Sequence, residues 1–85
     1  MDETLIRKQL VEVETHVNRG SNHISRQRTL ITRLAEQGQN LEVANGSLKV
    51  FLEIQDLHLE HRDHLRQLVR ELEQLPSYIL QAGEN

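Results

Sequence analysis

The apolar residues in the first half of the chain recur at alternating steps of four and three. This spacing aligns them along one stripe of an α-helix and is typical of helices that pair as a coiled coil. Only Gly20 and Gln27 depart from the pattern. The positions are Ile6, Leu10, Val13, Val17, Gly20, Ile24, Gln27, Ile31 and Leu34. The sequence therefore predicts one long amphipathic helix, from about residue 3 to 37.

The same spacing resumes in the second half, where two overlapping registers fit about equally well. The first is Leu41, Ala44, Leu48, Phe51, Gln55, His58, Arg62, Leu65, Val69 and Leu72. The second is Phe51, Ile54, His58, His61, Leu65, Leu68, Leu72 and Leu75. Between the two halves, Gly38 suits the position after a helix C-terminus, and Asn40 suits an N-cap. Pro76 is expected to stop the second helix.

These signals predict an all-α fold, a long antiparallel helical hairpin. Its helices would span about 3–37 and 41–75, with a turn at 38–40, and residues 76–85 would form a short tail that contains Tyr78-Ile79-Leu80. Two alternatives remain open. In the first, Gly20-Ser21 divides the first helix in two. In the second, Asn45-Gly46-Ser47 supplies the turn, because glycine in a helix interior costs about 1 kcal/mol relative to alanine.

A lone hairpin does not cover all of the apolar residues of the second helix. Residues 48–59, LKVFLEIQDLHL, carry large apolar side chains nearly all round the helix, so one partner helix leaves some of them in water. The simplest solution is a two-fold homodimer that forms a four-helix bundle. The expected interaction seam comprises Ile6, Leu10, Val13, Val17, Gly20, Ile24, Ile31, Leu34, Leu48, Phe51, Ile54, His58, Leu65, Leu68 and Leu72.

Composition narrows the class of protein further. The chain has 85 residues, no cysteine and a net charge of −3, which indicates one small domain without disulfides and argues against a nucleic-acid binder. No segment has the roughly 20 apolar residues of a membrane span. The acidic, polar start MDETLIRKQL is unlike a signal peptide, so a cytoplasmic location is expected.

The charges are unevenly distributed along the chain. Residues 15–35 contain four arginines and no acid, whereas residues 36–64 contain six acids and two basic residues. In a hairpin folded at residues 38–40, contacting positions have numbers that sum to about 75. This rule predicts ion pairs between Arg33 and Glu42 and between Arg19 and Asp56.

Five histidines, His16, His23, His58, His61 and His64, are the main candidates for chemistry. The hairpin would bring His16 near residues 58–61. However, the steps of three from His58 to His64 spread these rings over about 120° of the helix surface, so no single ion can bind all three. We therefore expect no metal site and no cofactor. A seam histidine that becomes charged near pH 6 would instead weaken an apolar contact.

Residues His16-Val17-Asn18-Arg19-Gly20-Ser21 resemble the phospho-accepting motif of histidine phosphotransfer domains, in which a basic residue lies three positions after the histidine and is followed by Gly-Ser. The resemblance implies that His16 is a phosphoacceptor, with Arg19 and Gly20 in support. Asn18 replaces the apolar residue of that motif. From the residues alone, Gly20 is equally explained as a small residue at a close helix contact, opposite Phe51 or Gln55.

Residues 23–65 resemble a group of small proteobacterial helical-hairpin proteins of unknown function. The shared features are His23-Ile24 with Gln27-Arg28, Ile31 and Leu34, Gly38, Ala44, Phe51 with Glu53 and Gln55 at a displaced spacing, and His58-Arg62-Asp63. The resemblance covers about half the chain. It implies a helical hairpin and a bacterial origin, and it implies no mechanism.

The sequence thus predicts a small non-enzymatic protein–protein interaction module. It would be homodimeric, with an unidentified protein as a further partner, and would bind neither nucleic acid nor membrane. The alternative is a phosphotransfer or signalling-regulatory bundle that uses His16.

Overall fold

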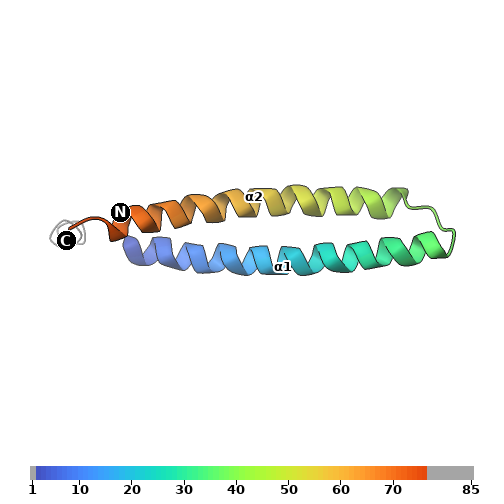
Figure 1. Ribbon diagram of the computed structural model, residues 1–85, viewed down its shortest axis with the longest axis horizontal. Coiled ribbons are helices and arrows are strands. Elements are labelled where there is room, and N and C mark those ends of the chain that lie inside the picture. The colour runs from blue at the N-terminus through green and yellow to red at the C-terminus, as the bar shows by residue number, and fades with distance from the viewer. Residues whose placement is uncertain (1, 77–85) are drawn as a thin grey trace.

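The fold is an antiparallel hairpin of two long helices. A computed structural model describes residues 2–76, in which helix α1 spans Glu3–Glu36 and helix α2 spans Glu42–Glu73. The two helices lie side by side over their whole length (Figure 1). No strand occurs within that range. The predicted all-α hairpin is confirmed, whereas Tyr78-Ile79-Leu80 of the predicted tail lie outside the described residues.

Both helices continue through the segments that were considered as alternative breaks. Gly20-Ser21 lies inside α1, and Asn45-Gly46-Ser47 lies inside α2. The predicted alternatives, a helix break at Gly20-Ser21 and a turn at Asn45-Gly46-Ser47, are therefore wrong. In each case the surrounding apolar spacing stays in phase, so seam contacts hold the helix and offset the modest cost of an interior glycine.

The turn follows from Gly38. Its φ is +67°, a left-handed conformation that glycine adopts without a steric penalty. The Gly38 N–H donates to the Ala35 carbonyl at 3.1 Å, and the Gln39 N–H donates to the Leu34 carbonyl at 2.9 Å. These two bonds define a Schellman motif, which satisfies the last carbonyls of α1. The chain then reverses within residues 37–41.

Side chains also cap the helix starts. Asp2 is the N-cap of α1 and accepts a hydrogen bond from the Thr4 N–H at 2.9 Å. Asn40 Oδ1 accepts from the Glu42 N–H at 2.8 Å, although the N-cap of α2 is Leu41, one residue later than predicted. At the other end, α2 stops at Glu73, three residues before Pro76 and slightly earlier than predicted.

Within the hairpin, α2 uses the first of its two registers. Gln55, Val69 and Leu72 are buried in the seam. Ile54 and Leu75, which belong to the second register, are 45% and 40% exposed. The second register therefore lies beside the seam rather than in it.

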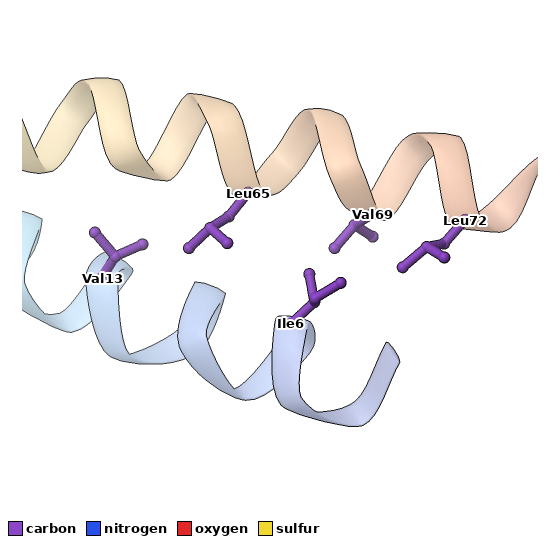
Figure 2. Packing of buried hydrophobic residues seen from close by; sticks show 5 residues of the cluster. All are labelled: Ile6, Val13, Leu65, Val69 and Leu72. Carbon is purple, nitrogen blue, oxygen red and sulfur yellow. The ribbon is translucent and has the colours of Figure 1, made fainter. Parts of the chain in front are cut away.

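The apolar core is concentrated at the end of the hairpin opposite the turn. Five side chains form it, and Figure 2 shows them reaching between the helices: Ile6, Val13, Leu65, Val69 and Leu72. Leu10 and Leu68 pack against this cluster. Toward the turn, the seam residues Ile24, Ile31 and Leu34 are only half-buried. Two helices enclose little volume, and no described side chain is completely buried.

The predicted ion pairs are wrong. The ion pairs that join the two helices within residues 2–76 are Arg7–Glu73 at 3.2 Å and Arg66–Glu14 at 3.1 Å. Arg19 and Asp56 are level along the hairpin but lie on opposite sides of the seam. Arg19 lines a hollow with Ile54, and Asp56 is two residues, or about 200°, further round α2. Arg33 and Glu42 fail for the same reason, because each lies two heptads nearer the turn, Arg33 from Arg19 and Glu42 from Asp56, and so on the same sides of the seam.

Within the described part of the chain, two glycines outside the seam give opposite predictions. An added Cβ meets no atom within 4 Å at either Gly38 or Gly46. Gly38→Ala is expected to destabilise the hairpin by about 1 kcal/mol, because alanine resists the left-handed conformation. Gly46→Ala is expected to stabilise it by about 1 kcal/mol through helix propensity. Urea unfolding followed by circular dichroism measures both, and shifts of the same sign would contradict this account.

Candidate functional site

A buried polar contact crosses the middle of the seam at Gln55, which is only 7% exposed. Its Nε2 donates to the Val17 carbonyl oxygen at 2.9 Å and to Ser21 Oγ at 3.2 Å. The Val17 carbonyl lies inside α1 and has a second lone pair available for this bond. Gln55 Oε1 is buried against Gly20 and has no hydrogen-bond partner.

Gly20 makes this contact possible. A Cβ at this position would overlap Gln55 Oε1 and crowd the rest of the amide, and its three nearest atoms all belong to Gln55. The glycine is therefore a notch in α1 that accommodates the Gln55 side chain. Gly20 does lie at a close helix contact, opposite Gln55, one of the two residues that the sequence suggested.

A second glutamine makes the reciprocal contact nearer the turn. Gln27 Nε2, from α1, donates to the Ala44 carbonyl oxygen of α2 at 2.8 Å. Each helix thus contributes one seam glutamine that binds a backbone carbonyl of the other helix. Polar groups in an apolar seam fix its register, since a shifted pairing leaves them buried without partners.

One flank of the seam gathers most of the histidines, and we call it the histidine face. Two adjacent hollows mark it, and both include His16 and His58 in their lining. The hollow toward the turn has a volume of about 270 Å³, and the other hollow has a volume of about 340 Å³. The face comprises Glu12, His16, Arg19 and His23 of α1 with Phe51, Ile54, His58 and His61 of α2.

The rings of His16 and His58 stack across the two helices, with centroids 5.2 Å apart and planes inclined by 21°. His16 is exposed, whereas His58 is half-buried and its Nδ1 is buried without a hydrogen-bond partner. His23 lies beside Phe51 with centroids 6.1 Å apart. The expectation that His16 meets residues 58–61 is confirmed.

The opposite flank is different in character. It carries the Arg7–Glu73 and Arg66–Glu14 ion pairs, together with Ser21. Hydrogen bonds to Glu3 and Glu73 raise the pKa of Arg7 above its ordinary value. These side chains are well exposed, so solvent screens their attraction and such pairs contribute little to stability. The charges on this flank thus have partners within the chain itself.

Helix α2 carries a second apolar stripe that the hairpin leaves in water. Val50, Ile54 and Leu57 are 50%, 45% and 64% exposed, and Val43 is 83% exposed. Their spacing of seven, four and three residues places them on the side of α2 that borders the histidine face. Single exposed apolar residues are normal on protein surfaces, but a stripe of them marks an interaction site.

The structure separates the predicted seam residues into two groups. Those in the hairpin seam are buried or half-buried: Ile6, Leu10, Val13, Val17, Gly20, Ile24, Ile31, Leu34, Leu48, Phe51, His58, Leu65, Leu68 and Leu72. Ile54 is the exception. Sequence reasoning did not identify the hydrogen bonds of Gln27 and Gln55 to backbone carbonyls, because a carbonyl exists at every residue and carries no sequence signal.

Residues 2–76 were also compared with the requirements of a metal site and of a membrane-spanning helix. No group of three or more His, Asp or Glu side chains in that range is arranged to hold a metal ion. Neither helix there is long and apolar enough to cross a membrane. Comparison with known protein families, curated proteins and solved structures finds no match. The resemblances of residues 16–21 and 23–65 therefore stay predictions, and function must be argued from the chain's own chemistry.

The Gly20–Gln55 contact predicts that Gly20→Ala changes the stability of the hairpin in opposite directions in the presence and in the absence of the Gln55 side chain. Gly20→Ala alone should destabilise the hairpin by about 1 kcal/mol, because displacement of the Gln55 amide costs more than the gain in helix propensity. In a Gln55→Ala background the same substitution should stabilise by about 1 kcal/mol through helix propensity, since the nearest atoms to the new methyl group are those of the Gln55 amide. Chemical unfolding of the four proteins measures this coupling, and equal effects in both backgrounds would show that Gly20 is not a notch for Gln55.

Proposed function

We propose that this chain is a small, non-enzymatic, helical protein–protein interaction module that acts as a homodimer. The observation that carries the proposal is the exposed apolar stripe of α2 beside the histidine face. It follows the same heptad spacing as the hairpin seam, which is the pattern of a helix that packs against two neighbours.

The thinness of the hairpin supports the same conclusion. The molecule extends 65 × 18 × 14 Å, so it is only one layer of helices deep. Stable helical domains bury their apolar stripes between at least two layers. A second layer would cover Val50, Ile54 and Leu57 and would complete the four-helix bundle that the sequence suggests.

The role of such a module is to present a rigid surface. The two carbonyl-bound glutamines hold the helices in one register, and the flank with the Arg7–Glu73 and Arg66–Glu14 pairs stays polar. Once the apolar stripe is covered by the partner copy, the polar flank remains available for a further protein. The identity of that protein is not encoded in any motif of the sequence.

The mass in solution tests the dimer. Light scattering coupled to size-exclusion chromatography should give twice the chain mass of 9.9 kDa at micromolar concentration. The melting temperature should rise with protein concentration, because dimerisation stabilises the folded chain by mass action. A mass of 9.9 kDa at every concentration, with a constant melting temperature, would rule out the proposal.

A second candidate function, phosphotransfer through His16, is favoured by one observation. His16 is exposed on the same face as Arg19, whose guanidinium is suited to phosphate. Gly20 lends less support than its motif position suggests, because Gln55 fills the space above it. Incubation with histidine-kinase phosphodonors should then give an acid-labile phosphate that His16→Gln abolishes. Absence of label from the parent protein would remove this candidate.

A further inference from the structure

We propose that the second copy docks on the histidine face in an antiparallel arrangement, about a two-fold axis at the level of His16 and His58. In this arrangement α2 packs on α2 of the partner chain, and α1 packs on α1 of the partner chain. The inference rests on the proposed homodimer and makes it specific. It is argued from two patterns, one on each helix, that locate the same axis independently.

The first pattern is the side of α2 that borders the histidine face, where most positions are exposed, Ser47 and Leu68 are half-buried, and Leu68 also packs against the hairpin core. At alternating steps of four and three, its positions read Val43, Ser47, Val50, Ile54, Leu57, His61, His64, Leu68, Glu71 and Leu75. If α2 packs antiparallel on α2 of the partner chain, with the two-fold axis at residue 59, each position meets the partner position for which the two residue numbers sum to 118.

The pairing about residue 59 places an aliphatic side chain against an aliphatic residue or a histidine ring, and a polar residue against a polar residue. Val50 meets Leu68 of the partner chain, and the two most polar non-histidine positions, Ser47 and Glu71, also meet. Ile54 and Leu57 cover the aromatic rings of His64 and His61. An apolar surface that is complementary to itself under a two-fold rotation is what a symmetric dimer requires.

The second pattern is on α1. Residue 59 of α2 is level with residues 15–16 of α1, because His16 stacks on His58. A two-fold axis at that level brings together α1 positions whose numbers sum to about 31, and these include Glu12 and Arg19. Both line the histidine face, and neither forms an ion pair within the described part of the chain.

This register places each Glu12 beside Arg19 of the partner chain, twice per dimer. A slide of the partner chain by one heptad, which moves the axis half a heptad toward the turn, would instead place the two Arg19 side chains together at the axis, where like charges repel. The apolar pattern and the charge pattern thus select the same register. The histidines at positions 16, 58 and 61 of both chains would then surround the axis.

Disulfide cross-linking tests the register, because the chain has no cysteine of its own. The double variant Val50→Cys/Leu68→Cys should form a covalent dimer on mild oxidation, since the two positions face each other across the axis. Its matched controls are the two single variants. In an antiparallel dimer two copies of position 50 are about 27 Å apart along the bundle, far beyond the Cα separation of a disulfide.

Charge exchange provides a second measurement that does not disturb the apolar stripe. Arg19→Glu and Glu12→Arg should each raise the dimer dissociation constant about tenfold, because each creates two like-charged contacts. The double exchange Glu12→Arg/Arg19→Glu should restore the parent value. Both residues are exposed in the hairpin, so helical content by circular dichroism should not change.

The outcomes separate this inference from the proposed function. A parent protein that stays monomeric overturns both. A dimeric parent in which the double cysteine variant does not cross-link, or in which a single variant cross-links as readily, overturns only the antiparallel docking on the histidine face. Cross-linking of the double variant alone, together with charge rescue, supports the inference.

Discussion

The hairpin depends on one polar side chain placed in an apolar seam. Gln55 is tolerated there because Gly20 leaves room for its amide and because the Val17 carbonyl accepts its N–H. A buried amide without such a partner would cost about 1–3 kcal/mol, so any other alignment of the two helices is penalised. Gln27 and Ala44 repeat this arrangement from the opposite helix. The apolar residues supply the attraction between the helices, and the hydrogen bonds of the two glutamines determine how the helices are aligned.

The two flanks of the seam carry different kinds of side chain. One flank pairs its charges within the chain, as Arg7 does with Glu73. The other collects stacked histidines, unpaired charges and the apolar residues that α1 does not cover. This asymmetry arises mainly from α2, whose two overlapping registers are both apolar. One register builds the hairpin, and the other is left for a second contact.

The sequence predicted the hairpin, its turn and most of its seam because these depend on periodicity and on glycine, both visible in the residues. The heptad from Ile6 to Leu34 and the left-handed turn at Gly38 are examples. Asp2 was also readable as an N-cap, although the helix start was placed without it. The sequence did not show which of the two registers of α2 faces α1, since both registers are apolar. The charge pairs failed because a sum rule gives the level of two residues and not the side of the seam on which each lies.

The two carbonyl-bound glutamines also divide the rod into sections that tolerate changes of length differently. Residues 28–43, beyond Gln27 and Ala44, form the turn end, and an insertion there leaves the alignment of the remaining chain unaltered. Between Gln27 and Val17 on one helix, and between Ala44 and Gln55 on the other, a single inserted residue moves one glutamine off its carbonyl while the other stays bound. Natural variation in length should therefore collect at the turn end. Between the two glutamine contacts, each helix must keep a fixed number of residues.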